Sequence, residues 1–359
     1  MVVAVEGVAE NRSLFQPVLP KSGGVNGVFY GFDFHVGVGE QPPQLIEVNT
    51  NAGGALMSLA VTEAQRPLPV GDSWRPQPGV SESIFLEMFR CEWATISDRP
   101  LTQVAIVDSA PASQFMYAEF LAFRSMFERA GISAIIADPS ELVWTGASLT
   151  YRGQAIDLVY NRLTDFALVQ PENTVVRSAW LSGKVAVTPH PYGHATRADK
   201  TLLSVWSDPV RLRAAGVEEE TIRVLSASIP STIRVDANNA EDLWKSRAQY
   251  FFKPRSGFGG RAVYRGDKVT RGRWAEVIGG DYVAQRFVPP ATRRVCVDGV
   301  DIDLKYDVRA FVYDGTVQLV VARLYQGQTT NMRTPGGGFA AVLSDGWRPR
   351  RESNARPTA

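Results

Sequence analysis

The order of apolar and polar positions divides the chain into a central stretch of alternating strands and helices and two flanking stretches with other patterns. Up to about residue 65 the sequence predicts a helix, the strands GVFYGFDFHV and PQLIEVNT, and a helix over ALMSLAVTEAQ. From 81 to about 190, apolar strands such as QVAIVDS and LVYNR alternate with amphipathic helices, which predicts a parallel sheet covered by helices. From 196 to about 345 the pattern predicts helices followed by mostly antiparallel strands.

The first predicted hairpin sets two carboxylates against each other. Asp33 and Glu47 lie equally far from Glu40, so symmetric pairing places them opposite each other, and Asn49 points the same way as Glu47. Opposed carboxylates repel, and a cation such as Mg²⁺ would neutralise them together with phosphate oxygens. The alternative is a solvated polar face with a shifted register. Four apolar neighbours are expected to face a core, namely Phe32, Phe34, Ile46 and Val48.

A second segment, YFFKPRSGFGGRAVYRGDK, combines a lysine at a strand end with a glycine-rich loop. Lys253 ends the strand, and Gly257, Gly259 and Gly260 follow in the loop. Glycines let backbone N–H groups approach an anion, and the lysine adds a positive charge, as in a phosphate-binding loop. The segment is not a Walker A loop, because no Gly-Lys-Ser/Thr closes it and a strand follows. A plain hairpin is the alternative.

A third segment predicts two long strands that turn at Asp314-Gly315. Lys305, Asp307 and Arg309 alternate with apolar residues and therefore share one face of the first strand, and Arg323 ends the second strand. Asn331 and a run of three glycines follow. Such a face is suited to binding anions, because arginine holds phosphate or carboxylate with two parallel hydrogen bonds. An ordinary charged outer face is the alternative.

Composition and charge narrow the classes of function. The 38 basic and 37 acidic residues leave a net charge of +1, which gives no electrostatic basis for binding nucleic acid or an anionic membrane. The first residues lack the pattern of a secretory signal, and no apolar run approaches bilayer-spanning length. Two cysteines far apart in sequence, Cys91 and Cys296, favour a reducing compartment. We therefore expect a cytoplasmic protein.

Taken together, these segments resemble ATP-grasp ligases, and bacterial glutathione synthetase in particular. The motifs that carry the resemblance are DKTLLSVWSDP, FFKPRSGFGGRAVYR, YVAQRFVPP, KYDVRAFVYDG and VARLYQGQTTNMRTPGGG. In that family the metal motif, an Asp followed by Glu-x-Asn, comes after these segments, whereas here GFDF and LIEVNTNAGG come first. The resemblance covers roughly residues 20–65 and 95–345, and it implies a circular permutation like that in the synthetase module of glutathionylspermidine synthase.

The implied fold is α/β, with α+β ATP-grasp lobes beside a parallel-sheet domain of the type that precedes them in the family. The expected units are the permuted C-terminal part with the metal hairpin (1–65), a linker and helix (66–100), the substrate domain (101–190), the N-lobe with the Gly-rich loop (191–284), the C-lobe (285–345) and a disordered tail (346–359). Because the metal ligands must reach the phosphates, residues 1–65 are expected to pack beside residues 285–345.

The resemblance also implies roles for individual residues. Contacts with ATP are expected from Lys200, Lys253, Gly257, Gly259, Gly260, Gln285 and Phe287. Metal ligation is expected from Asp33, Glu47 and Asn49, and catalytic contacts with the phosphates and an acyl-phosphate from Arg309, Arg323 and Asn331. Arg162 matches an arginine near the substrate. Two departures stand out: Gly31 replaces an arginine of many relatives, and the hinge reads Gln285-Arg286-Phe287 where many have Gln-Glu.

The implied activity is an ATP-dependent ligation with Mg²⁺, or with Mn²⁺ as an alternative. A carboxylate attacks the γ-phosphate, and an amine then displaces phosphate from the acyl-phosphate. The expected partners are small-molecule or peptide carboxylates and amines, and the oligomeric state stays open, a homodimer included. A nucleotide-binding pseudoenzyme and a kinase on the same fold are the alternatives. A Rossmann dehydrogenase is excluded, because no G-x-G-x-x-G follows QVAIVDS.

Overall fold

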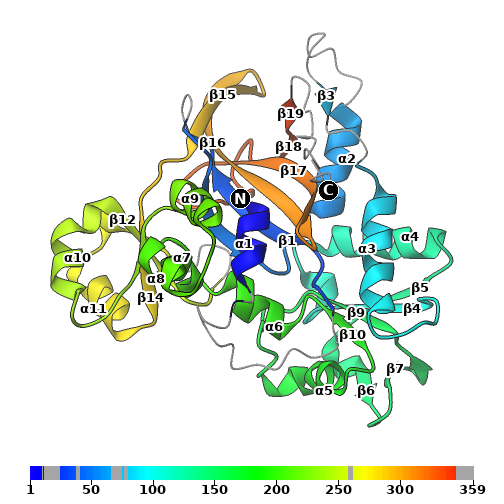
Figure 1. Ribbon diagram of the computed structural model, residues 1–359. Coiled ribbons are helices and arrows are strands. Elements are labelled where there is room, and N and C mark those ends of the chain that lie inside the picture. Colours follow the sequence, from blue (N-terminus) through cyan, green and yellow to red (C-terminus); the bar gives the residue numbers. More distant parts are fainter. Residues whose placement is uncertain are drawn as a thin grey trace, which may run out of the picture.

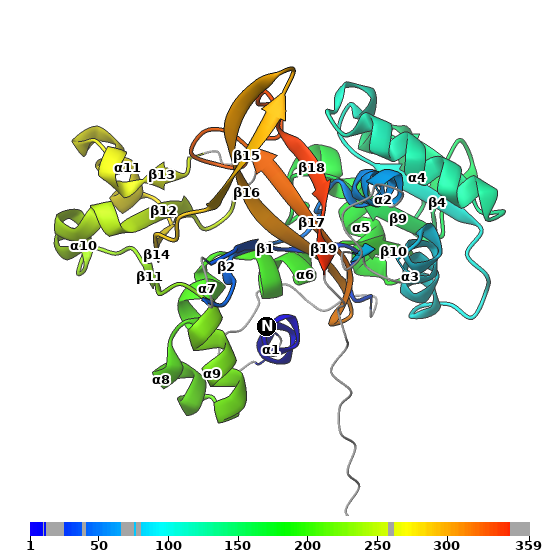
Figure 2. The ribbon, with the colours of Figure 1, turned by 90° about the horizontal axis from the view of Figure 1, so that it is seen from above.

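A central antiparallel sheet lies between a smaller sheet with its helices and an α/β unit (Figure 1, Figure 2). The computed structural model describes residues 1–9, 11, 25–37, 41–65, 75–76, 80–257 and 262–344. The tail predicted for 346–359 and the loop glycines Gly259 and Gly260 lie outside these residues, as does most of the proline-rich linker. No helix in the described ranges is long and apolar enough to cross a membrane.

The central sheet joins strands from both ends of the sequence. Its order is β18-β17-β16-β1-β2, and β15 also pairs with β16. The strands are β1 (Tyr30–His35), β2 (Gln44–Asn49), β15 (Ala291–Val297), β16 (Val300–Tyr313), β17 (Thr316–Tyr325) and β18 (Gly338–Ala341). Because β1 pairs with β16, the expectation that residues 1–65 pack beside residues 285–345 is confirmed for these two strands.

From Gly31 to Asp33, the pairing of β1 with β2 has the register that the sequence predicts. Asp33 lies opposite Glu47, and Gly31 lies opposite Asn49. On the other edge of β1, Asp33 faces Arg309 of β16. The shifted register is therefore wrong, and two carboxylates do share one face of the hairpin.

A bulge in β2 changes which apolar residues face the core. The register shifts after Asp33, so that Phe34 pairs with Leu45 and Ile46 is the additional residue. Phe32 and Val48 are buried in the core as predicted, and Leu45 joins them. Ile46 lines a pocket instead, so its assignment to the core is wrong, because the extra residue interrupts the alternation of faces.

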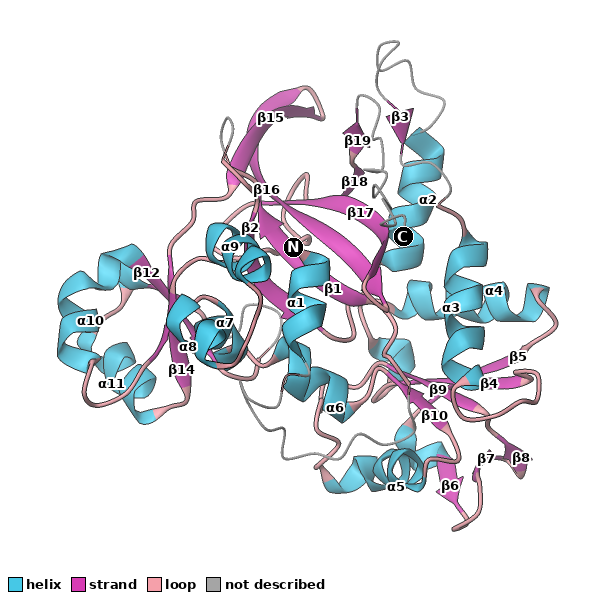
Figure 3. Cartoon of the chain, viewed as in Figure 1, coloured by secondary structure: helices cyan, strands magenta, loops and turns pink. Residues whose placement is uncertain are grey.

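The predicted parallel sheet forms within the α/β unit, in the order β10-β9-β4-β5. Its strands are β4 (Gln103–Val107), β5 (Ser133–Ala137), β9 (Leu158–Asn161) and β10 (Ala186–Thr188). Helices α3 (Glu82–Ala94) and α4 (Tyr117–Arg129) cover one face, and α5 (Thr174–Ser182) covers the other, as the two separate core clusters show (Figure 3). A short sheet extends the unit through β6 (Leu142–Trp144), β7 (Leu149–Tyr151) and β8 (Gln154–Ala155).

The smaller sheet is antiparallel and has the order β11-β14-β12-β13. Its elements are β11 (Thr232–Arg234), β12 (Tyr250–Pro254), β13 (Tyr264–Arg265), β14 (Tyr282–Arg286), α10 (Ala240–Ser246) and α11 (Arg271–Gly279). The segment before it contains α6 (Pro191–Gly193), a π-helical turn (His194–Ala198), α7 (Thr201–Trp206), α8 (Pro209–Ala214) and α9 (Glu219–Ser228). The antiparallel strands expected after residue 196 are confirmed.

The remaining elements attach to the central sheet. Helix α1 (Val2–Ala9) shares a core with β1, β2, α7 and α9, and α2 (Ala55–Gln65) has the bounds that the sequence predicts. The short strands β3 (Arg75–Pro76) and β19 (Leu343–Ser344) pair with each other. Phe29, directly before β1, connects the central sheet to the α/β unit, because its ring contacts Phe85, Tyr160 and Phe311 with centroids 5.0–6.2 Å away.

Candidate active site

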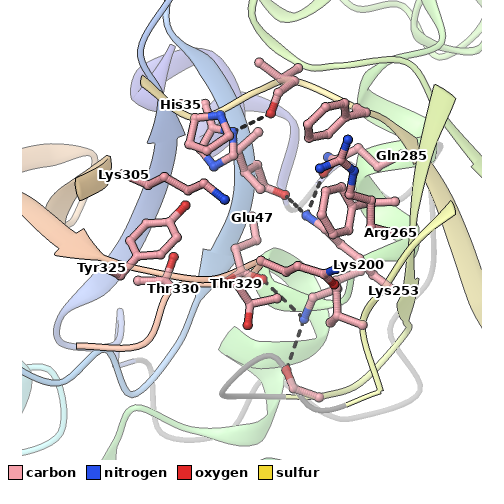
Figure 4. Close-up of a pocket in the computed structure, with 18 of the residues that line it drawn as sticks. His35, Glu47, Lys200, Lys253, Arg265, Gln285, Lys305, Tyr325, Thr329 and Thr330 are labelled. Atoms are coloured by element: carbon pink, nitrogen blue, oxygen red, sulfur yellow. Dashed lines mark hydrogen bonds and ion pairs between the residues drawn. The ribbon is translucent and has the colours of Figure 1, made fainter. Parts of the chain in front are cut away.

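A pocket lies between the central sheet and the smaller sheet, and residues from both line it (Figure 4). Strands β1, β2, β16 and β17 form one wall, and β12, β13 and β14 form the other. The loop after β17 closes one side. The lining contains the predicted residues Glu47, Asn49, Lys200, Lys253, Gly257, Gln285, Phe287, Arg309 and Arg323. The fold thus brings together candidates that lie more than 250 positions apart in the sequence.

Two buried lysines face the centre of the pocket. Lys253 of β12 donates to the carbonyl oxygen of Ile46 at 3.1 Å and to Oε1 of Gln285 at 2.6 Å. Lys200, at the start of α7, donates to the carbonyl oxygen of Gly257 at 3.1 Å. Burial lowers the pKa of Lys253 to about 8, although the nearby Glu47 works against that shift. An ammonium has three protons, so both lysines keep a donor for an anion in the pocket.

One end of the pocket is aromatic. The rings of Phe251 and Phe287 lie 5.4 Å apart, and the guanidinium of Arg265 sits 4.8 Å from the ring centre of Phe287. Gln285 is buried beside them, and its Nε2 has no hydrogen-bond partner among the described residues. Because Lys253 holds Oε1, the free amide N–H₂ is oriented as a donor. Flat rings with a buried donor suit a planar heteroaromatic base.

The predicted metal ligands form a connected group on β1 and β2. Nδ2 of Asn49 donates to Asp33 Oδ2 at 2.9 Å and to Glu47 Oε1 at 3.2 Å. Lys200 lies 3.7 Å from Glu47 Oε2. Burial alone would raise the pKa of Glu47, but the charges of Lys200 and Lys253 and the bond from Asn49 outweigh it and lower the pKa to about 2. Glu47 therefore stays ionised and faces the pocket.

Asp33 has different surroundings from those that the sequence predicts. Arg309 binds both of its oxygens, from Nε at 2.6 Å and from Nη2 at 2.7 Å. Nη2 of Arg323 lies 2.9 Å from Asp33 Oδ2, and Nε of Arg323 donates to Asp307 at 2.6 Å. Burial disfavours the charge of Arg323, but Asp33 and Asp307 outweigh it and raise its pKa. Two guanidinium groups thus neutralise Asp33, whereas the ion pair of Glu47 is with Lys200.

A divalent cation fits part of this group. Glu47 and Asn49 line the pocket beside the lysines and offer the hard oxygen ligands that Mg²⁺ prefers. Asp33 is only 2% exposed, and two arginines and an amide already occupy its oxygens. No cluster of three His, Cys, Asp or Glu side chains with metal-binding geometry occurs in the described ranges. Glu47 and Asn49 could therefore hold Mg²⁺ directly, whereas Asp33 could do so only after releasing Arg309.

Asp33 is not part of the pocket lining, and two further predicted residues lie apart from it. Asn331 is exposed, and its Oδ1 accepts a hydrogen bond from the backbone N–H of Arg333 at 3.0 Å. Thr329 and Thr330, just before it, line the pocket in its place. Arg162 lies at the end of β9 in the α/β unit, against the rings of Phe120 and Tyr160.

Sequence reasoning missed several polar residues of the lining, among them His35 and Arg265. Nδ1 of His35 lies 2.7 Å from the carbonyl oxygen of Val288, which makes Nδ1 the donor, and burial lowers the pKa of His35. Arg265 pairs with Phe251 across β12 and β13. His35 is two residues beyond Asp33, so the alternation of a strand would have placed it on the same face. Nothing in the local sequence distinguishes Arg265 from its many exposed neighbours.

No family model matches the sequence, and no curated protein sequence matches it. Among solved structures, a glutathione synthetase-like effector of Globodera pallida is similar, with 10% identity, a TM-score of 0.59 and coverage of 95% of this chain and 83% of the effector. A protein of Methylobacillus flagellatus named for gamma-glutamylcysteine synthetase gives a TM-score of 0.49 at 10% identity, over 95% of this chain and 85% of its own. The ATP-grasp ligase PsnB gives a TM-score of 0.35 at 14% identity, over 69% of this chain and 90% of PsnB. The latter two likenesses are too loose to support an argument. The likeness to the effector concerns the fold alone, and it agrees with the motifs: the chain has an ATP-grasp-like fold.

Proposed function

We propose that the protein is a Mg-ATP-dependent ligase that activates a carboxylate as an acyl-phosphate and joins it to an amine. The observation that carries the proposal is the composition of one pocket, whose lining includes aromatic rings, two buried lysines and two buried arginines. These groups suit the base, the phosphates and the reacting acyl group of an ATP-dependent acyl activation. The glutathione synthetase-like fold supports the same reaction class.

Each group has a distinct task in this proposal. Phe251, Phe287 and the free amide of Gln285 hold the base, and Lys200 and Lys253 hold the phosphates together with the loop that begins at Gly257 and continues through Gly259 and Gly260. Glu47 and Asn49 hold Mg²⁺, with Asp33 as an additional ligand, and Mn²⁺ is the alternative ion. The metal supplies charge neutralisation for the transferring phosphoryl group.

The arginines act at the reacting end. The substrate carboxylate oxygen attacks the γ-phosphorus, the bond to the bridging oxygen breaks, and ADP leaves. Arg309 and Arg323 neutralise the charge that develops on the phosphoryl oxygens and position the acyl-phosphate for the amine. Asn331 would join them if the loop after β17 closed over the substrate. Arg162 binds the substrate at the α/β unit.

The layout of the chain is part of the proposal. Strands β1 and β2, which contain the metal ligands, precede the rest of the site in sequence and pair with β16 in space. This arrangement supports a circular permutation, with the metal hairpin in residues 1–65, the substrate domain in 101–190, and the two lobes in 191–284 and 285–345. We propose a cytoplasmic location, in keeping with two free exposed cysteines.

Trapping the acyl-phosphate tests the reaction class. The protein is incubated with Mg-ATP and hydroxylamine over a panel of carboxylates, and both ADP and hydroxamate are measured. A ligase yields hydroxamate with a suitable acid. Arg309→Lys keeps the charge but loses the two-pronged geometry, and we expect it to lose about a hundredfold in rate, or ~3 kcal/mol. Arg293→Ala, an exposed arginine of β15 outside the pocket, is the matched control.

The alternatives give other results. ADP release with phosphorylated product and no hydroxamate on any acid would indicate a kinase on this fold. ATP binding by calorimetry without turnover over the whole panel would indicate a nucleotide-binding pseudoenzyme. The intact pair of Glu47 and Asn49 beside Lys200 argues against the pseudoenzyme, because nucleotide binding alone does not require a metal-binding carboxylate held ionised.

A further inference from the structure

An arginine outside the pocket lining joins three separate segments of the chain next to Lys200. Arg255 directly follows β12, and its Nε donates to Asp199 Oδ2 at 2.7 Å, while its Nη1 donates to Asp281 Oδ2 at 3.3 Å. Asp199 directly precedes Lys200, and Asp281 directly precedes β14. The guanidinium therefore ties the smaller sheet to the segment that contains Lys200.

Backbone hydrogen bonds pass through the same residue. The carbonyl oxygen of Arg255 accepts from the N–H of Lys200 at 3.2 Å, and the N–H of Arg255 donates to the carbonyl oxygen of Asp281 at 2.8 Å. Two residues further along, the carbonyl oxygen of Gly257 accepts from Nζ of Lys200 at 3.1 Å. Lys200 and Gly257 both line the pocket, and Arg255 is the point at which their two segments are joined.

The carboxylate that receives Arg255 is itself fixed in position. Asp199 is buried, and its Oδ1 accepts from the N–H of Thr201 at 2.9 Å and from the hydroxyl of Thr201 at 2.7 Å. The backbone N–H of Asp199 donates to the carbonyl oxygen of His194 at 3.2 Å. Because these bonds orient Asp199, its Oδ2 gives the guanidinium of Arg255 one defined place beside Lys200.

The bond between Arg255 and Asp199 differs from an ordinary surface ion pair. The side chain of Asp199 is 11% exposed and that of Arg255 is 48% exposed, so water screens only one of the two partners well. The bond to Asp199 raises the pKa of Arg255, and Asp281 adds to the effect. By contrast, Arg234 pairs with Asp281 at 3.1 Å with both side chains exposed, and such pairs contribute little.

We propose that Arg255 is a positioning residue for the nucleotide phosphates, because it sets the spacing between Nζ of Lys200 and the backbone at Gly257. This role rests on the proposed function, in which both groups hold the phosphates. A displacement of about 1 Å in a positioning group can cost as much as a hundredfold in rate, since hydrogen bonds weaken steeply with distance and angle. Arg255 lies outside the lining and so acts through Lys200 and Gly257.

The test is the affinity of the full chain for Mg-ATP, Mg-ADP and AMP, measured by titration calorimetry. We expect Arg255→Gln to weaken ATP binding by about tenfold, ADP binding by less and AMP binding least, because the loss grows with the number of phosphates held. Arg255→Lys keeps the charge and should recover part of the ATP affinity. Arg234→Gln, which removes the exposed pair with Asp281, is the matched control and should leave all three affinities unchanged.

A double variant shows whether Arg255 acts through Asp199. Asp199→Asn keeps an oxygen for the N–H of Thr201 but removes the charge that faces Arg255. If the two residues act as one unit, the double variant loses no more ATP affinity than either single variant. Additive losses would overturn the proposal, and so would an equal loss for ATP and AMP, which a purely structural role would give.

Failure of the proposed function gives a different result. Wild-type protein that binds no ATP would refute both the ligase and the role of Arg255. ATP binding that depends on Arg255 as expected, without hydroxamate on any acid, would refute only the ligase. ATP binding unchanged in Arg255→Gln would overturn only the role of Arg255. If Arg255→Gln does not fold, Asp199→Asn and Arg255→Lys provide the same comparison of ATP with AMP.

Discussion

Replacing Gly31 with alanine should displace Arg309 from Asp33. A Cβ at position 31 would lie 2.7 Å from the Cβ of Ala52, 3.0 Å from Nε of Arg309 and 3.3 Å from its Cζ. Gly31 thus leaves the space across which Arg309 reaches from β16 to β1. No side chain projects from β1 at this position, and the guanidinium of Arg309 from the neighbouring strand occupies the space.

The expected loss in the free energy of unfolding has two sources, the crowding around the added Cβ and the disturbed ion pair of Arg309. Forcing extra atoms into a packed core costs about 1–3 kcal/mol. Breaking a buried ion pair by removing one partner costs about 3–5 kcal/mol. Because Arg323 still contacts Asp33 at 2.9 Å, only part of the second cost applies. We expect Gly31→Ala to lower the free energy of unfolding by about 3 kcal/mol, although Gly→Ala in a strand ordinarily raises it by about 0.5–1 kcal/mol.

Urea unfolding followed by tryptophan fluorescence measures this difference. Gly7→Ala, an exposed position of α1 with no atom within 4 Å of an added Cβ, is the matched control and should gain about 0.5–1 kcal/mol. The double variant Gly31→Ala/Ala52→Gly removes the 2.7 Å conflict and leaves the one with Arg309. Only partial recovery is expected from it.

Two results would refute the reasoning. If Gly31→Ala is as stable as the wild type, the strands adjust and Arg309 needs no space from Gly31. If Ala52→Gly restores full stability, the conflict lies with Ala52 and the ion pair is unaffected.

Three further predictions concern other groups. Glu47→Gln should abolish metal-dependent ATP turnover, measured as ADP release, and should slightly destabilise the fold, because Lys200 and Lys253 lose a counter-charge. Lys253→Met should weaken ATP binding by about a hundredfold in calorimetry, or ~3 kcal/mol, while the far-UV spectrum is unchanged. Burial raises the pKa of Asp108 from 3.8 to about 6, so ionisation of this carboxyl destabilises the fold as pH rises through that window. Asp108→Asn should therefore raise the free energy of unfolding by up to about 3 kcal/mol at pH 7.5 and leave it unchanged below pH 4. An equal rise at both pH values would contradict the raised pKa of Asp108.

The strand and helix pattern predicted much of the fold and the location of the hairpin formed by β1 and β2. Symmetric pairing about the turn predicts Asp33 opposite Glu47, which the structure confirms, although Phe34 and His35 nearer the turn pair one residue out of that register. Helix α2 begins and ends where the amphipathic pattern does. The bulge at Ile46 could not be predicted, because alternation in sequence reads the same with or without one additional residue. The bulge turns the side chain of Ile46 from the core to the pocket, and it brings Asp33 opposite Glu47 although the pairs nearer the turn are shifted by one residue.

The ion-pair partners of the charged residues could not be predicted from the sequence, for a different reason. Strand alternation places Arg309 and Asp307 on the same face of β16. The partner of Arg309, however, is Asp33, which lies 276 positions away in sequence on β1. Which strand pairs with which depends on the whole sheet. Asn331 shows the reverse case, since asparagine commonly binds its own loop backbone, and here its Oδ1 accepts such a local bond while its side chain lies outside the pocket lining.

The five residues from Thr50 to Gly54 hold three separate parts of the molecule together. Thr50 bonds to His194 at 3.1 Å, Asn51 donates to the carbonyl oxygen of Leu163 at 2.7 Å, and Gly54 donates to Glu119 at 2.8 Å. Asn49 directly precedes them. Any ligand that shifted Asn49 would have to carry or break these anchors, so its binding would be thermodynamically coupled to the packing of the α/β unit against the central sheet. Such a coupling is reciprocal, and a loosening of that packing would weaken the ligand's binding by the same factor.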